Sequence, residues 1–345
     1  MRNKRTTLSW LIVVVAFLYL GTQGAEATSH SKGAAQTDPG STLNWTLASL
    51  VPQYITEVSA ATDGRSVYIV GGSDGSPYTG NVRYARLRAN GSLGPWISTT
   101  PLPVPQVFHH AIVAYGGRLY VAGGYASGQG GLRTVMCATI MADGSLGPWT
   151  ELTSLPKDLY RSAMVADQGY LFVIAGWSDG YSSAQQNVYA APILADGTIG
   201  AWSETAPLPV PLHAHTASVY SHRLYVVGGM AGLTSGSVQS AVYMATVEAD
   251  GSLGGWQLQG SLPTNLQSHS ASVWRDNLVV IGGKTDANSG SISSVFVAPI
   301  HADGTLDSWE TANQLPIGIA FHDSLEINQR MYVLGAGPTL RTAYL

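Results

Sequence analysis

A tryptophan that recurs at a nearly constant interval restricts most strongly how this chain can fold. It closes a D-G-x-x-G-x-W-like string and falls at Trp45, Trp96, Trp149, Trp202, Trp256 and Trp309. The spacings are 51, 53, 53, 54 and 53 residues. Self-similarity at a period of about 50 residues indicates a propeller or a solenoid.

Each unit predicts four short strands. In the unit after Trp149, residues 162–166 alternate in polarity, and residues 170–176 form an apolar run that ends in glycine, typical of a strand buried on both faces. Residues 187–194 and 199–202 predict the third and fourth strands. Asp196-Gly197 between them predicts a type I′ hairpin turn. Asp-Gly recurs in later units, but one carboxylate per turn is too few for calcium, so we expect no metal there.

The two ends of the chain carry complementary half-units. Residues 40–45 match the fourth-strand string of every later unit, whereas residues 341–345 read as a third strand with no fourth strand after it. A terminal strand that completes the last sheet would close the molecule into a ring and cover exposed sheet edges. We therefore predict a closed ring of six blades over residues 42–345, with an open solenoid as the less economical alternative.

These residues resemble the kelch family of β-propellers. The resemblance rests on the glycine pairs that end the second strands, on an aromatic residue of the third strand and on the tryptophan of the fourth; the pairs are Gly71-Gly72, Gly123-Gly124, Gly228-Gly229 and Gly282-Gly283. It implies an all-β propeller of four antiparallel strands per blade, similar in architecture to the central domain of galactose oxidase and to secreted N-acetylneuraminate epimerases. It is weak evidence for function, because one fold hosts many functions.

Residues 1–27 predict a secretory signal peptide. Arg2, Lys4 and Arg5 precede an apolar run over residues 8–20, and Ala25-Glu26-Ala27 is a cleavage motif. The run is too short for a comfortable membrane span. We expect cleavage after Ala27, a flexible leader over residues 28–41 and a secreted or periplasmic protein that does not insert into a membrane.

The composition restricts the classes of partner and cofactor that we expect for this chain. Charged residues make up 11% of the chain and the net charge is −4, with no basic block, so we expect no nucleic-acid partner. The single cysteine, Cys137, falls on a predicted third strand, where we expect a small buried apolar residue. That position also disfavours a galactose-oxidase-like copper site, which needs a cross-linked cysteine at the channel mouth.

Histidines recur where the first strands enter the central channel. The register holds Val58, His110, Ser162, His215, His269 and His322. Four histidines in a ring raise the alternative of a channel metal. We expect a structural role instead, such as bonding a neighbouring blade, because ring symmetry spaces equivalent positions widely. We predict no metal and no cofactor.

Positions that break the repeat are the candidates for function. One residue before the histidine register stand Glu57, His109, Arg161, Ala214, Ser268 and Phe321, and one further back are Tyr160 and His213. With aromatic residues of the adjoining loops, these predict a ligand site at Glu57, His109, Tyr125, Tyr160, Arg161, Trp177, Tyr181 and His213.

Two functions fit this pattern. The first is a non-catalytic binding or scaffold module for a glycan or a protein partner, since tyrosine and tryptophan provide rigid rings that stack on sugars. The second, by analogy with the resemblance, is a carbohydrate-active enzyme such as an N-acetylneuraminate epimerase. In that alternative Glu57 is the acid/base and Arg161 holds the carboxylate.

Overall fold

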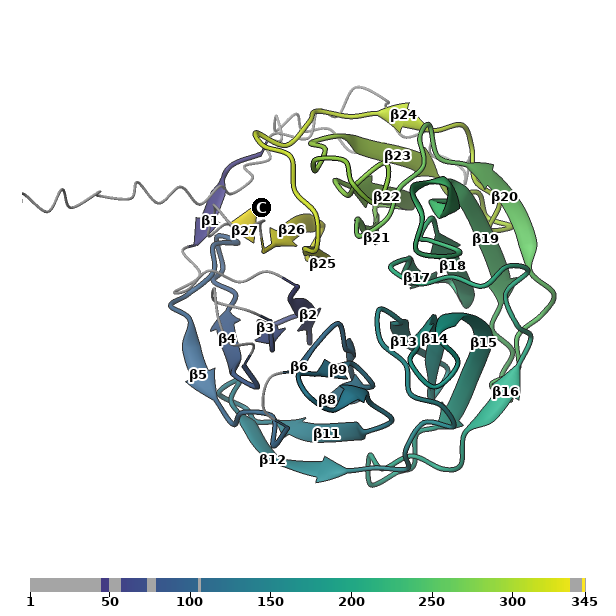
Figure 1. Cartoon of the computed structure of the whole chain (residues 1–345). Coiled ribbons are helices and arrows are strands. Elements are labelled where there is room, and N and C mark those ends of the chain that lie inside the picture. The colour runs from purple at the N-terminus through teal and green to yellow at the C-terminus, as the bar shows by residue number, and fades with distance from the viewer. Residues whose placement is uncertain (1–44, 50–56, 73–78, 105–106, 336–342, 345) are drawn as a thin grey trace, which may run out of the picture.

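The computed structural model describes residues 45–49, 57–72, 79–104, 107–335 and 343–344. Apart from one short 3-10 helix, η1 (Ser235–Ser237), its regular structure is all β-strand. Six four-stranded antiparallel sheets stand around a central channel as the blades of a ring (Figure 1). The predicted signal peptide and leader lie outside the described residues. Among the residues described, no helix is long and apolar enough to cross a membrane.

The strands of each blade follow one another from the channel outward. Blade one consists of β2 (Ser59–Thr62), β3 (Ser66–Val70), β4 (Val82–Arg86) and β5 (Ile97–Thr99), and blade two of β7 (Ala111–Tyr115), β8 (Arg118–Ala122), β11 (Val135–Ile140) and β12 (Leu146–Glu151). Blade three consists of β13 (Ala163–Asp167), β14 (Tyr170–Ser178), β15 (Ser183–Pro192) and β16 (Ser203–Thr205), and blade four of β17 (Thr216–Tyr220), β18 (Arg223–Val227), β19 (Ala241–Thr246) and β20 (Gln257–Ser261). Blade five consists of β21 (Ser270–Trp274), β22 (Asn277–Ile281), β23 (Val295–Pro299) and β24 (Glu310–Thr311). A smaller sheet of β6 (Val107–Phe108), β9 (Tyr125–Ala126) and β10 (Gly130–Gly131) sits on the rim of blade two.

Blade six is built from both ends of the chain. Its strands are β25 (Asp323–Ile327), β26 (Arg330–Leu334), β27 (Ala343–Tyr344) and, outermost, β1 (Leu47–Ser49). β1 pairs antiparallel with β27, with Leu47 opposite Tyr344. Trp45 Nε1 also donates a hydrogen bond of 2.7 Å to the carbonyl of Asn313. The N-terminal strand thus completes the last blade, as the two half-units predicted.

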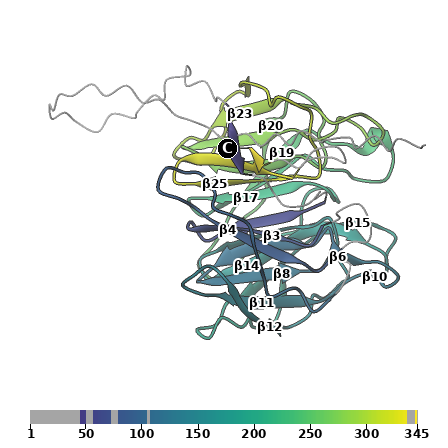
Figure 2. The same cartoon turned by 90° about the vertical axis from the view of Figure 1, so that its left-hand side faces the viewer.

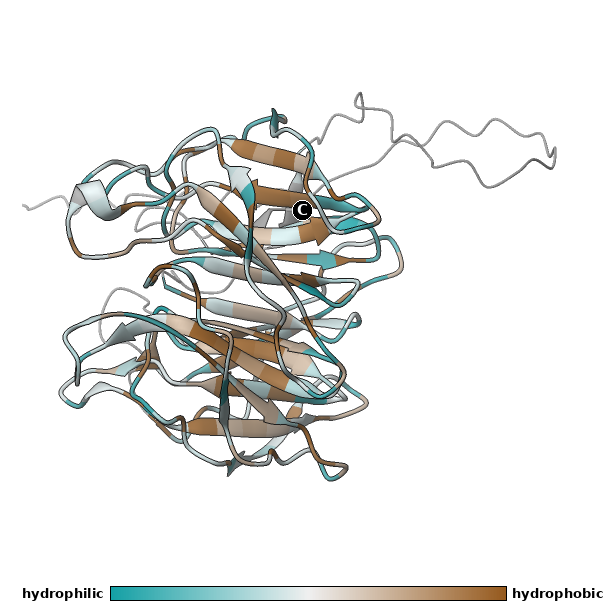
Figure 3. Cartoon of the chain, turned by 90° about the vertical axis from the view of Figure 1, so that its right-hand side faces the viewer, coloured by the Kyte–Doolittle hydropathy of each residue, from teal (hydrophilic) through white to brown (hydrophobic). Residues whose placement is uncertain are grey.

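The hydrophobic core lies between the blades. The second strand of each blade is buried almost completely; β3, for example, has no exposed or half-buried residue. Side chains of neighbouring blades interdigitate, as Tyr120 of blade two and Val173 of blade three do in one cluster. The side view coloured by hydropathy shows apolar residues concentrated in the strands (Figure 3). Stacking of this kind buries each sheet on both faces and leaves function to the ends of the strands.

Buried tyrosines tie four of the six blades to the next. Four second-strand tyrosines donate from the hydroxyl to the carbonyl of the Asp-Gly or Asn-Gly turn glycine in the following blade, at 2.8–3.0 Å: Tyr68 to Gly144, Tyr120 to Gly197, Tyr225 to Gly304 and Tyr332 to Gly91. The last of these joins blade six to blade one. It is therefore part of ring closure.

The prediction of type I′ turns at Asp-Gly is wrong. Only the glycine has a positive φ, for example 79° at Gly197, and Asp196 does not. Gly197 donates its amide to the Leu194 carbonyl at 2.8 Å, while the Asp196 carboxylate accepts from the Thr198 amide at 2.9 Å. This is a tight turn followed by a left-handed glycine, which hairpins with longer loops use. Adjacent positive φ values occur instead between first and second strands, as at Ser221 and His222.

The recurring tryptophan lies just before the outermost strand in five blades and within it only at Trp149. In four of the six, the indole N–H donates to a carbonyl of the preceding blade, as Trp149 does to Thr100 at 3.0 Å and Trp256 to Ala206 at 2.9 Å. The repeat therefore marks a contact between blades rather than a strand position.

The glycine pairs have a steric cause. A Cβ on the first glycine, Gly282, would lie 2.6 Å from the Ile319 carbonyl oxygen and 2.9 Å from Cε1 of His322 in the next blade. A Cβ on Gly283 would lie 2.7 Å from Cβ of His269 in its own blade. The channel histidines and the glycine pairs are thus two halves of one packing arrangement.

The channel seam between blades six and one uses a carboxylate. Asp323 Oδ2 accepts the Ala60 amide at 2.9 Å, and Oδ1 accepts the Ser324 amide at 2.8 Å. The equivalent residues of blades one and five, Ser59 and Ser270, bond the next blade through hydroxyls. Burial raises the pKa of Asp323 to about 6, and the two amide hydrogen bonds only partly offset that rise.

Gly282→Ala should destabilise the protein by about 2–4 kcal/mol, because it adds a steric clash to the cost of a left-handed alanine. Gly117→Ala is the matched control: its φ is also positive, at 73°, but nothing lies within 4 Å of the added Cβ. Backbone strain alone predicts about 1 kcal/mol for the control. Urea denaturation measures both, and equal losses would contradict the packing explanation.

Asp323 should make the folded protein less stable as pH rises from about 4 to 6. Its folded pKa of about 6 lies above the usual value of 3.8, so the folded state holds this proton more tightly than the unfolded state does. The penalty is absent at low pH and complete above pH 6, with a size of about 1–3 kcal/mol. Asp323→Ser, which copies Ser270, should flatten this part of the stability profile. An unchanged slope in the variant would argue against the assignment.

Candidate functional site

Six equivalent residues at the channel mouth share an unusual backbone conformation. Each stands where a connection between blades turns into a first strand, and none is a glycine. All six have left-handed φ angles: Glu57 58°, His109 55°, Arg161 52°, Ala214 52°, Ser268 51° and Phe321 56°. Non-glycine residues adopt this region at a cost, and such residues gather at functional sites.

Backbone hydrogen bonds join five of these residues, from His109 to Phe321, into an arc. We call this arc together with Glu57 the mouth ring. The amides of Arg161, Ala214, Ser268 and Phe321 each donate to the carbonyl of the equivalent residue one blade back, at 2.9–3.0 Å. The link is made by the main chain, so the side chain of each member is free to vary. This explains how a structurally uniform position carries six different residues.

Glu57 and His109 form the polar side of the mouth ring. Glu57 Oε1 lies 3.6 Å from His109 Nε2, and the two side chains are 18% and 9% exposed. Burial, helped by the positive charge of Arg161, lowers the pKa of His109 well below its usual value despite the nearby carboxylate. The imidazole is therefore neutral at neutral pH, and the contact is one of a charge with a neutral ring.

Arg161 provides the positive charge. Its amide bonds the His109 carbonyl at 2.9 Å, which makes the two residues direct neighbours on the mouth ring. Its Nε is buried without a hydrogen-bond partner, and its guanidinium forms no ion pair within the described residues. A buried donor without a partner is costly, so this side chain is suited to an incoming acceptor.

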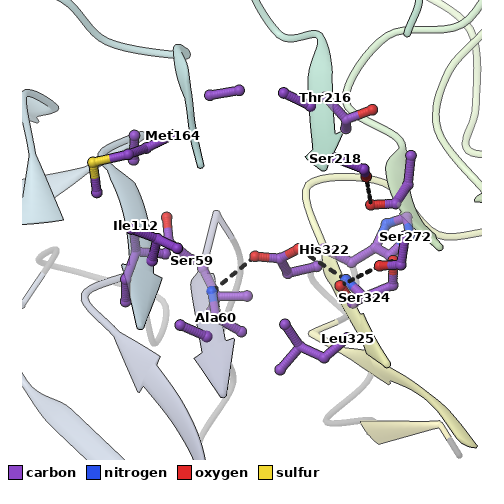
Figure 4. A pocket seen from close by; sticks show the side chains of 18 of the residues that line it. Ser59, Ala60, Ile112, Met164, Thr216, Ser218, Ser272, His322, Ser324 and Leu325 are labelled. Carbon is purple, nitrogen blue, oxygen red and sulfur yellow. Dashed lines mark hydrogen bonds between the residues drawn. The ribbon is translucent and has the colours of Figure 1, made fainter. Parts of the chain in front are cut away.

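These three residues face one cavity. Glu57, His109 and Arg161 line the upper part of a space of about 490 Å³ that continues between the first strands. Figure 4 shows side chains from the first strands around this space, among them polar Ser59, Thr216, Ser218 and Ser324 and apolar Met164 and Leu325. The cavity is polar at its mouth and mixed below.

Two of the four channel histidines form hydrogen bonds across seams between blades. His110, His215, His269 and His322 are 3–6% exposed, and burial lowers their pKa values to about 3–4. His269 Nε2 bonds Thr216 Oγ1 at 3.1 Å, and His322 Nε2 bonds Ser270 Oγ at 2.9 Å, each across a seam. Within the described residues no three histidine, cysteine or acidic side chains are grouped as a metal site. The contacts of His269 and His322 support the structural role expected for them, whereas the ring nitrogens of His110 and His215 are buried without a hydrogen-bond partner among the described residues.

An aromatic wall rises from the rim of blades two and three. Phe108 contacts Tyr125 and Tyr125 contacts Tyr160, both at 5.2 Å between ring centroids. Phe108 also packs edge-on against His109 at 4.9 Å, which connects the wall to the mouth ring. The pairing of β6 with β9 places Phe108 opposite Tyr125. Figure 2 shows the ring from the side, and β6 and β10 lie toward one of its two flat faces, which we call the loop face.

His213 supports this wall from beneath. It is 1% exposed, and its Nε2 lies 3.1 Å from the Gly232 carbonyl, which can only accept. Its ring packs edge-on against Trp177 at 5.2 Å. Burial lowers its pKa to about 4. His213 therefore lies behind Trp177 and does not line the cavity.

Tyr181 is separate from the rest of the predicted set. It is 61% exposed and its ring lies under Lys157, whose Nζ is 4.5 Å from the centroid. The structure therefore divides the eight candidates into three that line the cavity, four that build or support the aromatic wall and one outlying tyrosine.

Three further residues were missed as members of the site. Phe108 and Phe321 flank His109, at 4.9 and 6.3 Å between ring centroids. Asp179 accepts from Tyr160 Oη at 3.0 Å and from the Gly131 amide at 2.9 Å, so it fixes the wall. Phe321 could have been found, since it breaks the mouth-ring register. Asp179 had no such signal, because its partners are distant in sequence.

Comparison with known proteins identifies the repeat. Residues 109–337 match the KLHDC2/KLHL20/DRC7 Kelch-repeats domain model. Kelch repeat and BTB domain-containing protein 12 of Danio rerio is 28% identical over 191 residues, which cover 51% of this chain and 30% of that protein. Beta-scruin of Limulus polyphemus is 24% identical over 205 residues, covering 59% of this chain and 21% of that protein.

The solved structure titled "Structure of YjhT" superposes with a TM-score of 0.68 at 15% identity, covering 86% of this chain and 94% of that one. At this identity the likeness concerns the fold alone. The chain matches only about a fifth to a third of the length of the two curated relatives above, so their whole activities do not transfer. The repeat match extends over most of the described ring, and the chain belongs to the kelch-repeat family of β-propellers.

Proposed function

We propose that this propeller binds a small acidic glycan at the channel mouth, between Glu57, His109 and Arg161. The observation that carries the proposal is the Arg161 guanidinium, which has no ion-pair partner within the described residues and faces a cavity of about 490 Å³. A planar guanidinium binds a carboxylate through two parallel hydrogen bonds.

The surroundings of Arg161 suit a sugar acid. The cavity volume falls in the range of about 300–1,000 Å³ that is usual for small-molecule sites. The Phe108, Tyr125 and Tyr160 wall offers rings against which the apolar face of a pyranose can stack. Glu57 can accept from sugar hydroxyls, while the neutral His109 can donate or accept.

We further propose that the protein acts outside the cytoplasm, on the basis of the signal peptide predicted for residues 1–27. A protein without disulfides is compatible with this location because each blade is stabilised by burial on both faces. Acidic sugars of glycans and envelopes are available there.

Kelch propellers generally mediate protein–protein interaction, so a protein partner is the main competing use of the loop face. The mouth ring favours the smaller ligand. Its polar side chains are recessed, with Glu57 only 18% and His109 only 9% exposed, whereas a protein interface places its central contacts on accessible surface.

A second candidate is catalysis of sugar-acid mutarotation. The observation in its favour is the contact of the Glu57 carboxylate with a neutral imidazole, 3.6 Å apart, beside the only cationic member of the mouth ring. Mutarotation removes the proton of the anomeric hydroxyl and protonates the ring oxygen as the ring opens, then reverses these steps on the other face. Glu57 would exchange the proton, and Arg161 would hold the carboxylate.

Binding is tested by calorimetry with N-acetylneuraminate and, as the neutral comparison, N-acetylglucosamine. The wild-type chain should bind the acid more tightly, and Arg161→Gln should weaken it at least about tenfold through loss of a charge-assisted pair. Arg223→Gln, on the opposite face, is the matched control and should bind as wild type does. Equal affinity for both sugars, or no effect of Arg161→Gln, would contradict the proposal. If the immobilised chain retains an envelope protein but binds neither sugar, the protein-partner alternative is favoured.

Catalysis is tested by following anomer interconversion of N-acetylneuraminate by NMR. If the second candidate holds, the wild type accelerates the exchange, and Glu57→Gln loses about 100-fold or more of that rate while still binding the sugar. If the wild type binds the sugar without accelerating the exchange, the mutarotation candidate is wrong and the glycan-binding candidate remains.

A further inference from the structure

A second charged surface lies on the face opposite the mouth ring. This turn face carries the connections between first and second strands and between third and fourth strands. At the seam of blades one and six it holds a cavity of about 410 Å³ whose wall includes four arginines, Arg65, Arg86, Arg88 and Arg330. We call it the arginine pocket.

Three separate segments bring these side chains together. Arg65 ends the turn between β2 and β3, and its carbonyl accepts the Leu87 amide at 2.8 Å. This bond sets Arg65 beside Arg86 and Arg88, which precede and follow Leu87. Arg330 begins β26 of blade six and donates to the Asn90 carbonyl. The pocket therefore depends on ring closure.

Three of the four arginines break the repeat. The backbone bond from Leu87 to Arg65 recurs in four later blades as Ile140 to Gly117, Ile193 to Gly169, Val247 to His222 and Ile300 to Asp276. The counterparts of Arg65 are thus glycine, glycine, histidine and aspartate, and those of Arg88 are Met141, Leu194, Glu248 and His301. Arg86 is replaced by threonine or proline. No arginine recurs at these positions.

Arg330, in contrast, has a repeated structural task. Arg118 and Arg223 begin their second strands in the same way, and their guanidinium groups likewise cover the turn glycine of the following blade, Gly197 and Gly304. The fold accounts for Arg330 but gives no reason for the three arginines of blade one.

Two of the three added arginines lack neutralising partners. Arg65 and Arg88 are exposed and, within the described part of the chain, their side chains make no hydrogen bond or ion pair. Arg86 Nη1 donates to the Ala142 carbonyl at 3.1 Å, and its charge helps to lower the pKa of the nearby Asp143 carboxylate. The nearby Asp63 carboxylate accepts the amides of Arg65 and Ser66 at 2.9 and 2.7 Å and is used by its own turn. A cluster of like charges in a chain of net charge −4 costs stability unless an anion occupies it.

We propose that the arginine pocket binds a ligand bearing phosphate or sulfate groups. Guanidinium forks match the spacing of tetrahedral oxyanions, and four of them from three segments can engage more than one such group. This site is independent of the loop-face proposal, because the two lie at opposite ends of the strands.

The test is calorimetric titration of the full chain with inorganic pyrophosphate at an ionic strength of about 20 mM, where screening is weak. The double variant Arg65→Gln/Arg88→Gln should bind pyrophosphate at least about tenfold more weakly. Without ligand its melting temperature should be equal to or above that of the wild type, since neither side chain supports the fold and the change relieves repulsion between like charges. Arg118→Gln/Arg223→Gln removes the same charge from other parts of the turn face and should bind as wild type does. Absence of wild-type binding, or equal weakening in both double variants, would overturn the proposal.

Two further titrations identify the source of the anion. A nucleoside triphosphate and a sulfated disaccharide each bring several oxyanions, and binding of either that is lost in Arg65→Gln/Arg88→Gln supports the site. Arg161→Gln should leave this binding intact. If Arg161→Gln abolishes it, the ligand occupies the mouth ring and the assignment to the arginine pocket is wrong.

Discussion

Hydrogen bonds across the seams between blades are the interactions on which the rest of this structure depends. Each sheet ends where its blade ends, so neighbouring blades share no strand ladder and are joined by the connecting chain segments, by packing and by these bonds. The seams use tyrosine hydroxyls at the turn face, such as Tyr332 to Gly91, and tryptophan indoles at the circumference, such as Trp45 to Asn313. In the channel they use serine, threonine, histidine and Asp323. Neighbouring contacts of this kind define repeat architectures, and closing the ring removes the two exposed ends.

The same seams explain where variation is possible. The mouth ring is linked through main-chain amides and carbonyls, so its side chains carry no structural requirement and can be charged, aromatic or small. A uniform backbone thus presents Glu57, His109 and Arg161 on three consecutive blades while the other members are Ala214, Ser268 and Phe321. The turn face follows the same logic, since Arg330 repeats a structural contact and Arg65 and Arg88 do not. Departures from the repeat mark both proposed sites.

The regular spacing of the tryptophans made much of the six-bladed arrangement predictable from the sequence. Trp45 to Trp309 and the half-units at the ends required six blades with a shared last one, because a ring converts sequence spacing into angular position. For the same reason Glu57, His109 and Arg161, which are 52 residues apart in register, could be expected to be neighbours. Local geometry was less accessible. Asp196 keeps a negative φ because Gly197 alone meets the need of its turn, and this depends on the register of the hairpin.

Long-range contacts account for the remaining differences. His213 looked like a loop residue, but the approach of Trp177 and the Gly232 carbonyl buries it. The raised pKa of Asp323 results from a seam formed by residues far apart in the chain, Ala60 and Asp323, which no local pattern reveals. Tyr181 is aromatic like the residues of the wall, but it is exposed and lies outside the wall.

The central claim is that the mouth ring, through Arg161, is where this propeller binds its ligand. A crystal structure of the chain with N-acetylneuraminate tests it most directly. The account predicts the sugar carboxylate at about 3 Å from the Arg161 guanidinium, with the pyranose against the wall of Phe108, Tyr125 and Tyr160. A ligand bound elsewhere, with the mouth ring empty, would contradict it.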